Sequence, residues 1–152
     1  MSYPSFWNFL VENNHTQWYS YIAPFAIFVT VAALLFIMVW LFRNRPRLDR
    51  KDVLKLALLM SYTTVIFLPS MHDRYDFIYV AMAAILVILQ PGTLPAFAGL
   101  TCIGVQIYGR YLLDTQIPWL PLVYINYACY LFYCVWILRE LYKKKNSPAE
   151  SA

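Results

Sequence analysis

A short polar stretch near the middle of the chain concentrates the residue types that could do chemistry. His72, Asp73, Arg74, Tyr75 and Asp76 follow one another between two long apolar blocks. Ionisable residues at a membrane boundary need a structural or functional reason. On a helix that begins here, His72 and Asp76 stand four residues apart and share one face. A site for a charged ligand at the start of that helix is one interpretation of this pattern.

Two physical features favour an anion at this position. A helix N-terminus presents unpaired N–H groups and the positive end of the helix dipole. Arg74 and a protonated His72, oriented by Asp76, would add charge-assisted donors that suit phosphate oxygens. Arg110, which ends a later apolar block, is expected on the same side and would contribute from there. The alternative is a solvated loop with an interfacial arginine and tyrosine.

Other kinds of site find little support in the sequence. Cys102, Cys129 and Cys134 all lie inside apolar blocks, and their spacing matches no zinc or redox pattern. We therefore expect no metal and no cofactor. The net charge of +4 could suggest nucleic acid, but the basic residues flank apolar blocks, so it is interpreted as a topology signal.

The elements that must position the polar stretch are transmembrane helices. Of the 152 residues, 61% are hydrophobic and 13% charged, against roughly a quarter charged in soluble domains. The apolar residues come in blocks long enough to cross a bilayer. They predict an all-α polytopic bundle of about five transmembrane helices in one domain (residues 1–145), followed by a disordered tail (146–152). The expected spans are about 19–42, 53–68, 71–89, 94–113 and 119–141.

The basic residues predict the orientation of this bundle. Ten of the twelve lie in residues 43–55 and 139–145, and short cytoplasmic loops carry such an excess. An odd number of spans, with the N-terminus outside and the C-terminus in the cytoplasm, places both clusters inside. Lys55 is expected to snorkel to that basic side. A re-entrant hairpin over residues 71–113 satisfies the same rule with two fewer crossings.

The polar stretch also resembles a known family. The segment Phe67-Leu68-Pro69-Ser70-Met71-His72-Asp73-Arg74-Tyr75 is similar to the P-x-M-H-E-R-Y segment of GT-C-type membrane glycosyltransferases. The group that it resembles is mannosyltransferase-like and related to the GPI-anchor mannosyltransferases. Tyr3-Pro4-Ser5-Phe6-Trp7-Asn8 resembles their N-x-P-N-x-W loop. One departure is Asp73 where glutamate is usual, which keeps the carboxylate.

The resemblance implies a multi-helix enzyme that moves a sugar from a polyprenyl-phosphate-linked donor at the outer membrane face, with mannose as the candidate sugar. It covers only the C-terminal part of such enzymes, whose catalytic carboxylate lies in an earlier external loop. His72, Asp73, Arg74 and Tyr75 are thereby expected to line the donor site, and the catalytic base stays unassigned. The expected partners are membrane lipids, the sugar donor and a separate N-terminal half or partner membrane protein; nucleic acid is not expected.

Two other functions remain open from the sequence. One is a small non-enzymatic scaffold or assembly subunit, which needs no chemistry at His72. The other is a transporter subunit, which expects charged residues around a midplane cavity, whereas the apolar blocks carry almost none. In each case we expect an integral membrane protein, in the plasma membrane of a bacterium or the ER membrane of a eukaryote.

Overall fold

The computed structural model describes residue 7 and residues 19–46, 48–68, 75–113 and 119–146. These residues form five α-helices and one short 3-10 turn, with no strand among them, so the predicted all-α class is confirmed. The elements are α1 (Tyr19–Asn44), α2 (Arg50–Phe67), α3 (Asp76–Leu89), the 3-10 turn η3 (Pro91–Thr93), α4 (Leu94–Leu113) and α5 (Trp119–Asn146).

The helix bounds follow the predicted blocks, and those of α1 and α2 differ from them by three residues or fewer. α5 runs to Asn146 rather than 141, and Lys144 in this extension bonds to Asp49 and Asp52 at the start of α2. α3 is described from Asp76 onward, and the expected helix start at 71–74 lies outside the described residues. The predicted disordered tail lies outside them too, except for Asn146, which is helical.

Two of the described helices, α1 and α5, are long and apolar enough to cross a membrane by length and composition. α3 is a shorter apolar helix of 14 residues. The apolar composition of α1 and α5 supports a membrane location, in agreement with the sequence.

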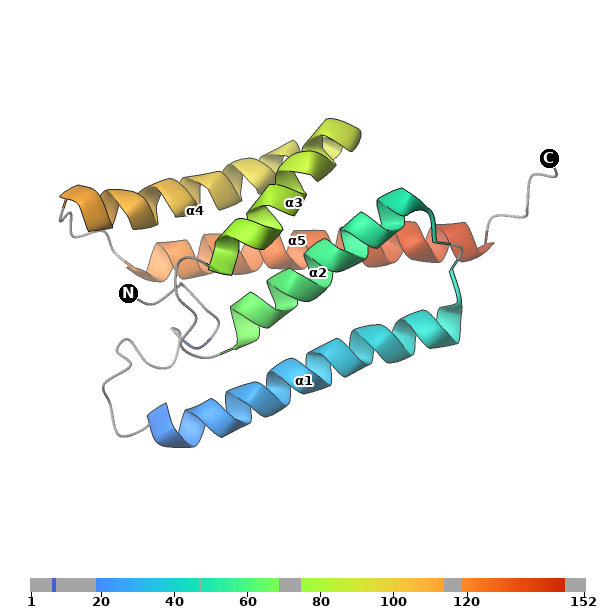
Figure 1. Cartoon of the computed structure of the whole chain (residues 1–152), viewed down its shortest axis with the longest axis horizontal. Helices are drawn as coiled ribbons and strands as arrows, with labels where there is room; N and C mark the ends of the chain where they lie inside the picture. Colours follow the sequence, from blue (N-terminus) through green and yellow to red (C-terminus); the bar gives the residue numbers. More distant parts are fainter. Residues whose placement is uncertain (1–6, 8–18, 47, 69–74, 114–118, 147–152) are drawn as a thin grey trace.

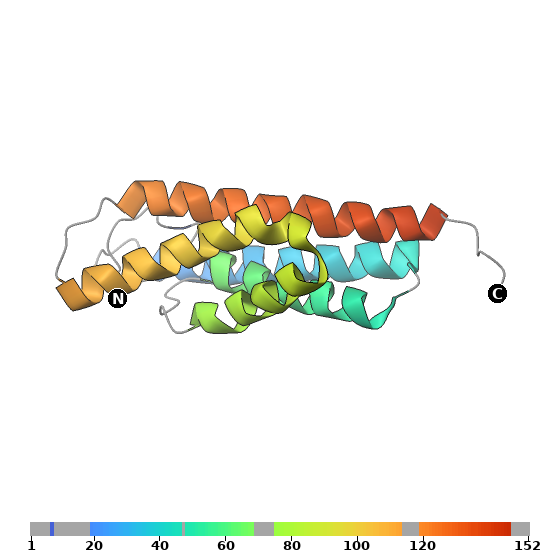
Figure 2. The same ribbon diagram turned by 90° about the horizontal axis from the view of Figure 1, so that it is seen from above.

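The helices form a bundle in which α2 and α5 are central (Figure 1). α2 packs against α1, α3 and α5, and α4 packs against α3 and α5. α1 packs chiefly against α2 and lies at the edge of the bundle (Figures 1 and 2). The core between the helices is formed by side chains such as Leu59, Ile66, Leu86, Ile103 and Ile137.

The bundle has two distinct ends. α1 and α5 end where α2 begins, and we call this the basic end (Figure 1). α3 and α5 begin where α2 and α4 end, and we call this the site end, because it carries the start of α3. The turn between α3 and α4 lies toward the basic end but stops short of the C-terminal end of α5 (Figures 1 and 2).

One glycine sets the distance between α4 and α5. A Cβ at Gly99 would come within 2.7 Å of the Cys129 Sγ, whereas Gly104 and Gly109 have open space around that position. The Cys129 thiol in turn donates a weak hydrogen bond to the Ala96 carbonyl across the same interface, at 3.6 Å. The two helices therefore approach closely at this one level of the bundle.

Candidate functional site

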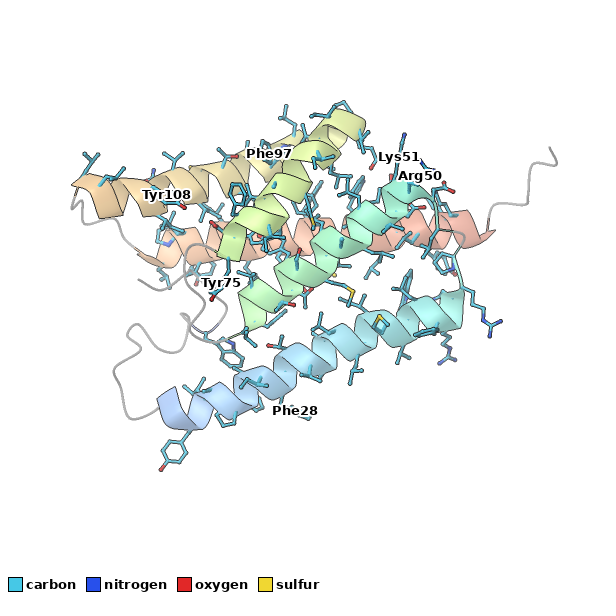
Figure 3. All side chains as sticks on the ribbon, in the orientation of Figure 1. Phe28, Arg50, Lys51, Tyr75, Phe97 and Tyr108 are labelled. Atoms are coloured by element: carbon cyan, nitrogen blue, oxygen red, sulfur yellow. The ribbon has the colours of Figure 1, made fainter. Side chains whose placement is uncertain are left out.

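The structure describes only part of the predicted anion site. His72, Asp73 and Arg74 lie outside the described residues, and Arg110 belongs to α4 but its side chain is not among those described. Tyr75 and Asp76 are described. Asp76 is the first residue of α3, and Tyr75 precedes it at the site end, where Figure 3 labels it.

Tyr75 and Asp76 have opposite environments. Tyr75 is 52% exposed, whereas Asp76 is 8% exposed in the first turn of α3. A carboxylate at this position interacts favourably with the positive end of the helix dipole. Asp76 begins a buried face of α3 that continues through Tyr79, Ala83 and Leu86. Asp76 therefore lies at the edge of the core, in the first turn of the helix that carries the candidate site.

A buried polar layer lies directly below this first turn. The Tyr79 ring, one turn after Asp76, stacks on the Tyr62 ring of α2 with centroids 4.3 Å apart and planes 5° apart. The Tyr62 hydroxyl donates to Asn126 of α5, whose side-chain and main-chain oxygens lie at 2.7 and 2.8 Å. Tyr62 and Asn126 are both fully buried. This arrangement links α2, α3 and α5 just inside the site end.

Two further tyrosines complete this layer. The Thr63 hydroxyl donates to the Leu59 carbonyl at 2.7 Å, so the Tyr130 hydroxyl, 3.2 Å from it, is the donor of that pair. The Tyr133 hydroxyl is buried without a hydrogen-bond partner in the described part of the chain. The rings of these four tyrosines pack both stacked and edge to face; they are Tyr62, Tyr79, Tyr130 and Tyr133.

Sequence reasoning missed most of this layer. It placed His72 and Asp76 on one helix face, but it gave no role to Tyr62 or Asn126. One signal was available, because Asn126 is an amide inside a block that is otherwise apolar and aromatic, and polar side chains in such positions hydrogen-bond between helices. Its partner lies 64 residues earlier, which the sequence alone does not reveal.

A second polar group lies toward the basic end. Lys55 of α2 is 2% exposed, pairs with Glu140 of α5, and lies 3.4 Å from Asp52 one turn earlier. Its ammonium also stands 5.3 Å from the centre of the Trp136 ring, within the range of a cation–π contact. Lys55 was expected to snorkel to the basic side. Its ammonium does lie toward that end, but it is buried against carboxylates of the bundle instead of reaching solvent.

Lys144 completes an ion-pair network at this end. It bonds to Asp49 at 2.7 Å and to the fully buried Asp52 at 2.6 Å. Asp52 also accepts from the Asp49 main-chain N–H at 3.0 Å, the arrangement of a capping box at the start of α2. Burial opposes ionisation of Asp52, but the hydrogen bonds from Lys144 and Asp49 outweigh it and lower its pKa. The hydrogen bonds that Lys144 donates to the Asp49 and Asp52 carboxylates raise the pKa of Lys144.

The described residues therefore offer two chemically different ends. The site end places a carboxylate at a helix N-terminus above a layer of tyrosines and an amide, which suits a polar ligand with hydroxyl groups. The basic end is closed by ion pairs. No group of three or more metal-ligating side chains occurs in the described ranges. No protein-family model, no curated protein and no solved structure matches the chain.

Proposed function

We propose that the chain crosses the membrane five times, with its N-terminus outside and its C-terminus in the cytoplasm. Two observations support this topology. α1 and α5 are long enough and apolar enough to span a bilayer. The exposed arginines and lysines gather where α1 and α5 end, as expected for the cytoplasmic side. The site end then faces outward.

Full crossing by α3 and α4 is favoured over a re-entrant hairpin by one contact. The 14 residues of α3 cover only about 21 Å, against a hydrocarbon thickness of roughly 30 Å. However, the Gln90 amide at the turn donates to Glu140 at 3.4 Å. Glu140 belongs to the ion-pair network of the basic end, so the turn reaches the polar groups there.

We further propose that the chain is the C-terminal portion of a membrane glycosyltransferase that uses a polyprenyl-phosphate-linked sugar. The carrying observation is that the segment resembling the GT-C motif joins α2 to α3 at the site end, where Asp76 is buried at the start of α3. The polar layer of Tyr62 and Asn126 lies next to the first turns of α3, where Tyr79 stacks on Tyr62. Such a layer provides a rigid floor for a site.

The roles of individual residues follow from their chemistry. His72 and Arg74, with Arg110 from the end of α4, would bind the donor phosphates. Asp73, Tyr75 and Asp76 would line the site and accept or donate hydrogen bonds to sugar hydroxyls. None of these is assigned as the catalytic base, which belongs to a separate N-terminal polypeptide or to the rest of a longer chain.

The test is sugar transfer from a polyprenyl-phosphate-linked donor, by the purified chain alone and together with the product of the adjacent upstream gene. Activity of the combination is expected, with mannose as the first sugar tried. Arg74→Gln and Asp76→Asn should each lower the rate by at least about tenfold, since each removes a charge from the site.

Matched controls come from the basic end. Arg50→Gln and Asp49→Asn make the same chemical changes far from the site and should leave the rate within about twofold. Membrane insertion of all four variants is checked by resistance to carbonate extraction. If the site variants were as active as the control variants, the polar stretch would not be the donor site. Inactivity of every combination would favour a scaffold or assembly subunit instead.

A further inference from the structure

The basic end carries more charge than the topology alone requires. Six arginine and lysine side chains are exposed there, and among the described residues none of them forms an ion pair. They come from three segments of the chain: the end of α1 with its following loop, the first turn of α2, and the last turns of α5. They are Arg43, Arg45, Arg50, Lys51, Arg139 and Lys143.

The acidic residues at this end do not neutralise these cations. Asp49 and Asp52 are bonded to Lys144, and Glu140 is paired with the buried Lys55. The three carboxylates and two ammonium groups thus form one ion-pair network. Because these carboxylates are already paired within the network, the six exposed cations have no acidic partner among the described residues; Figure 3 labels two of them, Arg50 and Lys51.

Exposed apolar side chains alternate with these cations. Phe42 is 72% exposed next to Arg43, and Tyr142 is 49% exposed next to Lys143. Leu48 and Val53, on either side of the first turn of α2, are 48% and 57% exposed. A soluble phosphate or a nucleic acid would leave these apolar groups in water. A phospholipid offers a phosphate for the cations and acyl chains for the apolar groups.

We propose that the basic end binds anionic phospholipid headgroups in the adjacent leaflet, selectively over zwitterionic ones. The proposal rests on the proposed membrane crossing and not on sugar transfer. Clusters of four to eight basic residues immediately next to a transmembrane helix attract acidic lipids, by about 1 kcal/mol for each cation near the surface. Arginine adds two-pronged hydrogen bonding to phosphate oxygens.

The test measures lipid selectivity in vesicles. The full chain is reconstituted with phosphatidylcholine and traces of spin-labelled phosphatidylglycerol or phosphatidylcholine. The fraction of motionally restricted label in the electron paramagnetic resonance spectrum gives the relative association constant. We expect about a fivefold preference for phosphatidylglycerol at low salt, the equivalent of roughly one surface cation. The preference should fall toward one at 1 M salt, where screening is nearly complete.

Variants separate charge from folding. Combining Arg43→Gln, Arg45→Gln, Arg50→Gln and Lys51→Gln should lower the preference from about fivefold to about twofold, while lysine in place of the three arginines should keep most of it. The double variant Arg139→Gln with Lys143→Gln, on the exposed surface of α5, should halve the lipid preference. It provides the test if the fourfold variant does not insert into the membrane.

A relative association constant near one for the wild type, in a protein that resists carbonate extraction, would overturn this proposal and leave the membrane crossing intact. An undiminished preference in the glutamine variants would overturn it as well. Loss of carbonate resistance in the wild type would instead contradict the crossing itself. Sugar transfer is measured separately and bears on neither result.

Discussion

The buried ion pair between Lys55 and Glu140 gives the sharpest test of the bundle. Glu140→Gln removes the carboxylate and keeps the shape of the side chain. Lys55, only 2% exposed, would then face Asp52 at 3.4 Å as its remaining anion, and Asp52 is already bonded to Lys144. The variant should therefore be destabilised by a buried charge that is only partly compensated.

The size of the effect follows from burial. Removing one partner of a fully buried pair costs about 3–5 kcal/mol. The Glu140 side chain is 32% exposed, so water already screens part of the interaction. We expect a loss of about 1–3 kcal/mol in the free energy of unfolding. Asp49→Asn is the matched control, because the Asp49 side chain is 74% exposed and its pair should contribute less than about 1 kcal/mol.

The assay is titration of the protein from mild detergent micelles into sodium dodecyl sulfate, followed by circular dichroism. Lys55→Met, alone and with Glu140→Gln, completes a double-mutant cycle that isolates the pairwise coupling. The coupling should exceed about 0.5 kcal/mol, and the double variant should be more stable than Glu140→Gln alone. A coupling indistinguishable from zero would refute the assignment of Lys55 to a buried ion pair.

Three further predictions concern packing, hydrogen bonding and pH. Gly99→Ala should cost about 1–3 kcal/mol, because its Cβ would meet a sulfur at 2.7 Å; the same stability measurement on Gly104→Ala should show no loss. Tyr62→Phe should cost about 1 kcal/mol through a lost hydrogen bond. Tyr133→Phe removes a hydroxyl that has no partner among the described residues and should be neutral or stabilising; equal losses would contradict the bonding scheme. The pKa of Asp52 is lower in the folded protein than its ordinary value of 3.8, so its ionised carboxylate stabilises the fold at pH values above 3.8. This stabilisation is lost as the pH falls through the lowered pKa of the folded state. The acid limb of a stability–pH curve should therefore flatten in Asp52→Asn, and an unchanged limb would show that other carboxylates set it.

The sequence was sufficient to predict the helices but not the pairing between them. Block length and composition located all five helices, because an apolar run must bury its backbone polar groups in helical hydrogen bonds. The extension of α5 depends on tertiary structure, because Lys144 binds two aspartates of α2 that lie more than 90 residues earlier. The burial of Lys55 in an ion pair was missed for a similar reason, since its partner Glu140 is 85 residues away.

The candidate site shows the same division. The residue types of the polar stretch, and the expectation that it lies where a helix begins, came from the sequence, and Asp76 does lie in the first turn of α3. The floor of the site depends on Tyr62 and Asn126, which meet across two helices. Side chains from different blocks face each other only once the rotation of each helix about its axis is fixed by packing, and an all-round apolar helix carries little signal for that rotation.

The ion-pair network has a consequence for the order of events during biosynthesis. When α2 leaves the ribosome, the partners of its lysine have not yet been made, since Glu140 follows Lys55 by 85 residues. Until α5 arrives, Asp52 and Lys55 have only each other and the surrounding water or headgroups. In the proposed topology, a newly made α2 is therefore expected to stay at a hydrated position in the insertion machinery until α5 is made, and to enter the bilayer late. Chains truncated before residue 140 should then show α2 accessible to water-soluble reagents, and extension through residue 146 should protect it.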